Sequence, residues 1–175
     1  MEIARPRETI LVLAELVQSQ MGLEPGVVAI YNQPRTLQPV SGLYVDVAFL
    51  GAKVYGATSK AVNDGFNQDL SEVQTVSKLE MFQIDIFSKN AEARIRNTEI
   101  IFALSGVAAQ QACEVHAMRI CQIPSGFVDL SQVEASARLN RYALTFNVFR
   151  SYSLARLAPT FTHFQSSSQA IVANR

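Results

Sequence analysis

Hydrophobic residues near the start of the chain recur with the spacing of a helix. In the segment RETILVLAELVQSQMG, which follows Pro6, they fall on one side of the predicted helix at Ile10, Leu13, Leu16, Val17 and Met21. Gly22 is a suitable end for this helix, because glycine adopts the backbone conformation that ends helices. Residues 23–42 contain three prolines and two glycines, so we expect a wrapping loop with one short strand at most.

Two later segments show the alternation of half-buried strands. The apolar positions are Leu43, Val45, Val47 and Phe49 in the first segment and Phe82, Ile84 and Ile86 in the second. Gln83 and Asp85 fall on the other side of the second strand. Between the two segments, residues 51–70 are small, polar and glycine-containing, and Asn63-Asp64-Gly65 is a strong turn signal. The pattern predicts a β-hairpin with a long, mobile arm.

The hydrophobic period becomes helical after Ser88-Lys89-Asn90. Either Ser88 or Asn90 can cap this helix, and Glu92 suits its positively polarised first turn. We expect one row of residues to face the sheet, widened by three further apolar positions. The row is Ile95, Thr98, Phe102, Ser105 and Ala109, and the widening residues are Ile101, Leu104 and Ala108.

The last third of the chain contains one weak and one strong strand signal. Residues 113–123, CEVHAMRICQI, are the weaker candidate, and the strong one is RLNRYALTFNVFRSY, with apolar residues at Tyr142, Leu144, Phe146 and Val148. The order of elements predicts an α+β fold, a mainly antiparallel sheet with an N-terminal helix and a central helix packed on one face and a long β-hairpin arm. We expect residues 1–158 to form a single domain and residues 159–175 to be a flexible or partner-ordered extension.

Composition excludes some classes of function. The 15 basic and 15 acidic residues cancel and form no block of like charge, which gives no electrostatic footprint for nucleic acid or an anionic membrane. No apolar run approaches the roughly 20 residues of a membrane span, so we expect a soluble chain made inside the cell. Charged residues make up only 17% of the chain, and a charge-poor surface suits protein contacts because charge is depleted at interface centres.

Candidate catalytic residues are few, and none lies in a supporting motif. His116 and His163 are the two residues expected to titrate near neutral pH. His116 is predicted to lie in a strand beside Cys113 and Cys121, which we interpret as small half-buried thiols, because a metal site needs more ligands at tighter spacing. His163 lies in the polar tail, where a solvent-exposed histidine is the ordinary case.

Carboxylates, glycines and arginines also lack the patterns of known active or binding sites. Asp46 and Asp85 fall on the polar sides of strands, where a solvated or interface carboxylate is expected. No glycine motif for binding phosphate occurs. Arginines near the last strand are spread along it and do not converge on one groove, so direct nucleic-acid binding is not expected. We therefore expect no enzymatic activity, no catalytic residue, no cofactor and no metal.

Two segments carry a pattern that belongs to a known structural family. Residues 83–104, QIDIFSKNAEARIRNTEIIFAL, combine a strand, a short polar turn and a helix that opens with small and acidic residues. Residues 127–161, FVDLSQVEASARLNRYALTFNVFRSYSLARLAPTF, place Asp129-Leu130 and Glu134 before an arginine-aromatic strand and a proline-containing exit. Together they resemble the tail-terminator (neck) proteins of tailed bacteriophages.

The resemblance implies a structural role. In that family, a small α+β subunit assembles into a hexameric ring on the end of the tail tube, stops polymerisation of the tube and presents a surface to the head connector. The implied partners are further copies of the chain, the tail tube protein, the sheath as an additional candidate, and head connector or adaptor proteins, with genomic DNA only passing through the lumen and no membrane contact. The implied location is the tail and neck of the virion, and the host cytoplasm during assembly.

A ring subunit needs surfaces that contact its own copies, and the hairpin arm is the candidate for reaching a neighbour. The candidate interface residues are Gly51, Tyr55, Asn63, Asp64, Phe66, Gln83, Asp85, Arg141 and Phe161. Another neck or head-to-tail joining component, such as a head-completion or tail tube protein, is an alternative of the same class. A small-molecule-binding α+β domain is an alternative of a different class, and it would need a concave site with converging polar groups.

Overall fold

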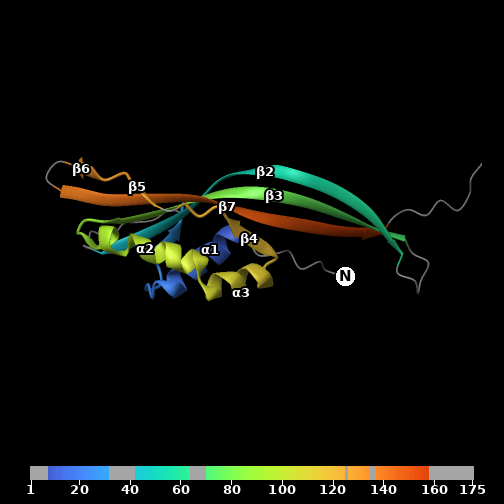
Figure 1. Ribbon diagram of the computed structural model, residues 1–175, viewed down its shortest axis with the longest axis horizontal. Coiled ribbons are helices and arrows are strands. Elements are labelled where there is room, and N and C mark those ends of the chain that lie inside the picture. Colours follow the sequence, from blue (N-terminus) through green and yellow to red (C-terminus); the bar gives the residue numbers. More distant parts are fainter. Residues whose placement is uncertain (1–7, 32–41, 64–69, 125, 135–136, 158–175) are drawn as a thin grey trace, which may run out of the picture. The chain divides into compact units, whose positions relative to one another are not determined.

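The fold is α+β, as the order of sequence patterns predicts (Figure 1). The computed structural model describes residues 8–31, 42–63, 70–124, 126–134 and 137–157. The helices are α1 (Thr9–Gln20), α2 (Glu92–Ser105) and α3 (Val107–Val115). The strands are β1 (Val28–Ile30), β2 (Leu43–Asn63), β3 (Leu70–Ser88), β4 (Met118–Cys121), β5 (Val128–Asp129), β6 (Gln132–Glu134) and β7 (Ala137–Leu157).

Seven strands pair in the order β1-β2-β3-β7-β4, and β5 and β6 also pair with β7. Strand β1 is parallel to β2, whereas β4, β5 and β6 are antiparallel to β7. Side-chain contacts give the relative directions of the central strand pairs, β2 with β3 and β3 with β7. Rings stack or tilt against each other between residues 44 and 87 and between 49 and 82, so β2 and β3 run in opposite directions. The hydroxyls of Ser77 and Ser151 and the rings of Phe82 and Phe146 show the same for β3 and β7.

The chain divides into two compact units. The larger unit comprises residues 1–57 and 76–152, and it contains all three helices. The smaller unit comprises residues 58–75 and 153–175, and its described part belongs to the strands β2, β3 and β7. These three strands therefore contribute residues to both units.

The core of the larger unit lies between one face of the sheet and the helices, which Figure 1 shows on the same side of the strands. The alternating residues predicted from the sequence form the sheet side of this core: Leu43, Val45, Val47, Phe82, Ile84, Ile86, Tyr142, Leu144, Phe146 and Val148 are all buried. Helix α1 contributes Leu13 and Val17, and Gly22 follows it with φ +62°. The predicted first helix and half-buried strands are thus confirmed, except that Phe49, expected on the buried side of the first strand, is 52% exposed.

Helix α2 is rotated relative to the sequence expectation. Its buried residues are Ala93, Ile100, Ala103 and Leu104, whereas Ile95 and Phe102 from the predicted inner row are 72% and 68% exposed. Apolar side chains lie on both sides of this helix, so periodicity alone could not select the buried one. The helix also ends at Ser105, and α3 begins after Gly106, whose extended backbone separates the two.

One further expectation is corrected. The predicted strand over residues 113–123 is helical at its start, because Cys113 lies in α3 and His116 is the residue that ends that helix. Only Met118–Cys121 forms a strand, and it follows Ala117, which has φ +48°. The predicted long hairpin arm is confirmed, since β2 continues to Asn63 and β3 begins at Leu70. The turn at Asp64-Gly65 and the tail from Ala158 lie outside the described residues.

Candidate assembly surface

Strand β2 passes from the core to an exposed surface within a few residues. Its alternating burial stops after Ala48, and large apolar side chains are then exposed on both of its faces. These are Phe49, Leu50, Val54 and Tyr55, of which Tyr55 is 74% exposed. Gly51 has φ +155°, a backbone conformation that side chains disfavour, and a Cβ there would meet no neighbouring atom within 4 Å. Backbone geometry, rather than space, therefore favours glycine at this position.

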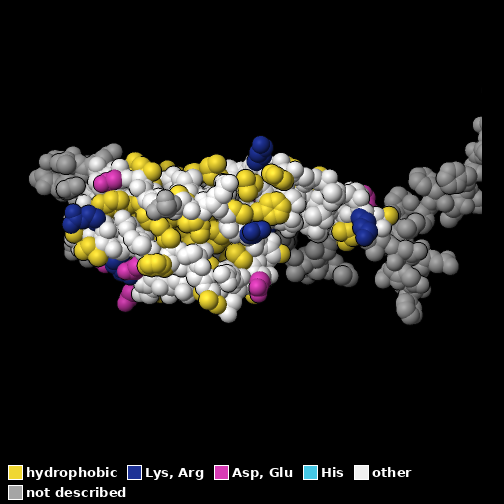
Figure 2. Space-filling model, in the orientation of Figure 1, with side chains coloured by type: hydrophobic (Ala, Val, Ile, Leu, Met, Phe, Trp, Pro, Cys, Tyr) yellow, Lys and Arg dark blue, Asp and Glu magenta, His cyan; other side chains and the backbone are white. Residues whose placement is uncertain are grey.

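Two of the exposed apolar residues of β2 make ring contacts within the larger unit: Phe49 meets Phe82, and Tyr55 meets Phe149. The ring of Tyr55 meets that of Phe149 edge-on, with 6.2 Å between the ring centroids, and yet most of Tyr55 faces outward. Figure 2 shows hydrophobic side chains spread over one face of the molecule, with charged groups few and scattered among them. Large apolar groups that stay exposed on a charge-poor surface are typical of protein contact sites.

Three of the predicted interface residues meet on β3 and β7. The Nε2 of Gln83 donates to Oδ2 of Asp85 at 2.8 Å, and the Nε of Arg141 donates to Oδ1 at 3.1 Å. Asp85 is only 5% exposed, so the expectation of a solvated carboxylate is wrong. The carboxylate lies on a central strand. Arg141 balances its charge, and Arg141 and Gln83 each donate a hydrogen bond to one of its two oxygens. The cluster fixes β3 to β7 and presents the half-exposed Arg141 side chain to solvent.

The remaining predicted interface residues are distributed differently. Gly51 and Tyr55 lie in the larger unit on the exposed part of β2. Asn63 is the last residue of β2. Asp64, Phe66 and Phe161 lie outside the described residues.

A buried polar network joins the start of α1 to β3 and β7, and the sequence analysis missed it. The hydroxyl of Thr9 donates to Oε2 of Glu80 at 2.6 Å and accepts from Nη1 of Arg150 at 2.8 Å. The hydroxyl of Tyr152 donates to Oε1 of Glu80 at 2.7 Å. The guanidinium carbon of Arg150 lies 5.1 Å from the centre of the Tyr152 ring.

The two charged members of this network are almost completely buried, Glu80 at 7% and Arg150 at 2% exposure. Burial, together with the hydrogen bond to Glu80, raises the pKa of Tyr152 above its usual value. A surface cavity of about 210 Å³ adjoins the network and is lined by Phe49 and Phe82 as well as by the polar groups. One signal in the sequence could have revealed this polar network. Glu80 and Arg150 continue the alternating rows of buried residues on their strands, so each is a charged residue at a core-facing position.

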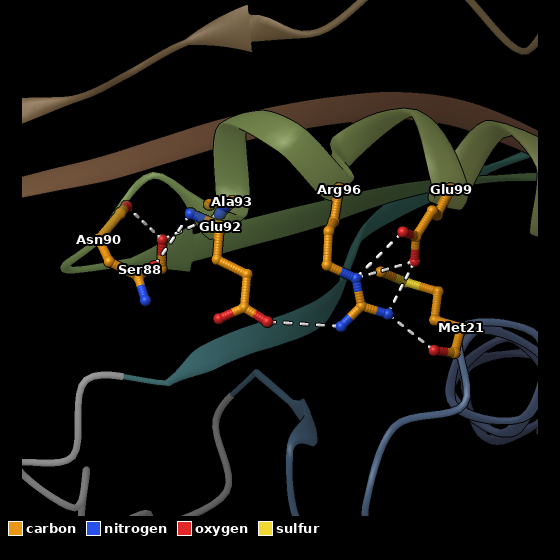
Figure 3. A network of polar contacts seen from close by, with 7 residues as sticks. All are labelled: Met21, Ser88, Asn90, Glu92, Ala93, Arg96 and Glu99. Carbon is orange, nitrogen blue, oxygen red and sulfur yellow. Dashed lines mark hydrogen bonds and ion pairs between the residues drawn. The ribbon is translucent and has the colours of Figure 1, made fainter.

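Polar contacts also fix the rotation of α2 (Figure 3). The Oγ of Ser88 accepts from the backbone N–H of Ala93, and Oδ1 of Asn90 accepts from that of Glu92, so both predicted caps act. Arg96 donates from Nη2 to the carbonyl oxygen of Met21 at 2.8 Å and pairs with Glu99 at 2.8 Å. The hydrogen bond with Glu99 raises the pKa of Arg96. Arg96 thereby ties α2 to the end of α1, with Ile95 directed outward.

The described residues hold no cluster of metal-binding side chains. No group of three or more histidine, cysteine, aspartate or glutamate side chains gathers there closely enough to bind a metal ion. Cys113 and Cys121 are free thiols. A cavity of about 450 Å³ adjoins Cys113 and is lined mainly by residues of α3 and by Arg119, Ile120 and Ile123. Among the described helices, none combines the length and the apolar character needed to cross a bilayer.

The smaller unit is a three-stranded sheet in the order β2-β3-β7. Ser59 donates to the Oε1 of Glu72, Gln74 donates to the same oxygen at 3.1 Å, and the hydroxyls of Thr75 and Ser153 lie 2.9 Å apart. The bonds from Ser59 and Gln74 lower the pKa of Glu72. Within residues 58–61, 72–75 and 153–156, no side chain of this unit is buried. Over these residues the unit therefore forms no buried core.

Comparison with known proteins gives likenesses among solved structures. No protein-family model and no curated protein sequence matches the chain. Among solved structures, the chain is similar to the sheath/tube terminator, in its extended state, of an extracellular contractile injection system called PVC. The TM-score is 0.44 with 10% sequence identity, and the match covers 95% of this chain and 66% of that one.

Proposed function

We propose that this chain is a non-enzymatic structural subunit that forms a ring on the end of a tail-like tube and stops the tube from growing, as a tail terminator does. The observation that carries the proposal is the smaller unit, whose strands are regular and bury no side chain within residues 58–61, 72–75 and 153–156. A three-stranded sheet is stable in water only when one face is covered, so this unit needs a partner surface.

Two further features support assembly with other protein subunits and the role of a tail terminator. Large apolar residues of β2, including Val54 and Tyr55, are exposed beside a surface that is poor in charge. The likeness of residues 83–104 and 127–161 to phage tail terminators supplies the particular role. On this proposal the chain binds the tube protein on one side of its ring and a connector on the other, the ring is hexameric, and DNA passes through its lumen.

The test uses purified full-length chain and polymerising tube protein, imaged by negative-stain electron microscopy. A terminator is expected to form rings, to appear at tube ends and to shorten the tubes as its concentration rises. Stacking of the chain into tubes by itself would identify a tube protein instead. A chain that stays monomeric and leaves the length of the tubes unchanged would refute the proposal.

A shortened variant tests the role of the smaller unit. Contacts between residues 59 and 72 and between 49 and 82 fix the register of the hairpin, which places Ala57 opposite Gln74. Replacing residues 58–73 by Asn-Gly closes the hairpin at that pair with a two-residue turn. The variant should fold and unfold cooperatively as a monomer but form no rings. Intact rings in this variant would show that assembly uses another surface.

A further inference from the structure

We infer that the smaller units of neighbouring copies join edge to edge, with residues 58–61 of β2 in one copy pairing with residues 153–156 of β7 in the next. The inference rests on the proposed function, because it names the contact that builds the ring. It starts from the two outer strands of the smaller unit, whose backbone groups face away from β3.

Both outer strands lack a second neighbour in this unit as far as the described residues extend. Strand β1 pairs with β2 only at residues 45–47. Strands β4 and β5 pair with β7 at residues 147–150 and 142–143, and β6 pairs with it at residues 137–139. Among the described residues, no strand pairs with the outer sides of residues 58–63 and 153–157. Each of these edges therefore presents a row of N–H and C=O groups that another strand can join.

The features that normally protect an open edge are sparse here. Residues 58–61 and 153–156 contain no proline, and each segment carries one basic residue, Lys60 or Arg156. Small side chains such as those of Ser59, Ala61 and Ala155 occupy most other positions and allow close approach of a strand. These edges are therefore suited to pairing.

The directions of the strands favour pairing of β2 with β7 rather than of like edges. Both strands are antiparallel to β3, so they run parallel to each other, and a rotated copy can offer its β7 alongside β2. This contact is head-to-tail, and when the rotation closes, every edge in the ring is paired. Two-fold pairing of β2 with β2 would leave both β7 edges open, which is the state that natural sheets avoid.

The charges are compatible with this joint. Ser59 bonds to Glu72, so Lys60, the next residue, points to the opposite face of the sheet. Thr75 lies opposite Ser153, which places Arg156 opposite Glu72 and on the Glu72 face, and the charge of Arg156 contributes to lowering the pKa of Glu72. In a continuous sheet the two cations therefore project from opposite faces, and the joint brings no like charges together.

Disulfide trapping tests the joint, with T58C/A155C and T58C/S153C made in a C113A/C121A background. The register places Thr58 and Ala155 on one face with β3 between them. Two strand spacings separate their Cα atoms by about 9.6 Å, beyond the roughly 7 Å limit for a disulfide. Within one chain the bond is thus excluded, so it can form only between copies. Two pairs are used because they sample two registers on the same face.

The expected result is rings by electron microscopy and, after mild oxidation, a shift from monomer to a ladder of covalent multimers on non-reducing gels. The single variants T58C and A155C should stay monomeric on the gel. Rings without a ladder from either pair would overturn the edge joint and leave the terminator proposal standing. Covalent dimers from T58C alone would show two-fold β2 pairing and also overturn it. Absence of rings in the parent background would refute the proposed function, and this inference with it.

Discussion

The hydroxyl of Thr9 links two buried charged residues of the larger unit, Glu80 and Arg150, by hydrogen bonds. Its hydroxyl donates to Glu80 at 2.6 Å and accepts from Arg150 at 2.8 Å, and all three residues are buried. Replacing Thr9 by Val keeps the shape of the side chain and removes both hydrogen bonds. Each bond to a charged group is worth about 1.5–3 kcal/mol. Because both share one hydroxyl and are not additive, we expect T9V to lower the free energy of unfolding by about 3 kcal/mol.

The control is T9S, which keeps the hydroxyl and loses one buried methyl group, at a cost of about 1 kcal/mol. The measurement is urea unfolding followed by circular dichroism, at matched and at varied protein concentrations because assembly adds to apparent stability. The midpoint should fall further for T9V than for T9S, with the slope unchanged. Equal losses in the two variants would show that the hydroxyl contributes nothing and that Glu80 and Arg150 are stabilised in another way.

Three further predictions concern the same unit. S88A removes the acceptor for the first turn of α2 and should cost about 1 kcal/mol in urea unfolding. R96M removes the bond to the carbonyl at the end of α1 and should cost about 1 kcal/mol, whereas R94M, at an exposed position of the same helix, should leave stability unchanged. The raised pKa of Tyr152, beside Glu80, means that its stabilising contribution is complete below the ordinary tyrosine pKa and is lost as pH rises through the raised one. Stability should therefore fall more steeply above pH 10 in the native chain than in Y152F, and parallel curves would contradict this.

The sequence predicts those elements in which one face is buried and the other is not. Val45, Val47, Ile84 and Ile86 alternate with polar residues because the helices cover only one side of the sheet. The same reasoning fails for α2, since apolar residues such as Ile95 and Ile100 lie on opposite sides of it. A tertiary contact, the bond from Arg96 to the end of α1, sets its rotation, and the spacing of residues does not encode that contact.

For a related reason, the sequence predicted a long hairpin arm but did not show how far its strands extend. The residues in the outer half of this arm are small or polar on both faces, so alternation gives no contrast there although the backbone forms regular strands. For the candidate surface, the sequence predicted Tyr55 as an interface residue, which stays a prediction. It also listed Gln83, Asp85 and Arg141 as candidates without showing that they meet. Burial of Asp85 depends on a side chain that lies 56 residues away in the sequence.

Native mass spectrometry of the full-length chain tests the central claim most directly, because the claim is that the smaller unit is completed by other copies. The account predicts one dominant species whose mass is a fixed multiple of the monomer, together with loss of that species in the variant that carries Asn-Gly in place of residues 58–73. A monomer at every concentration tested, or a multimer that persists unchanged in that variant, would contradict it.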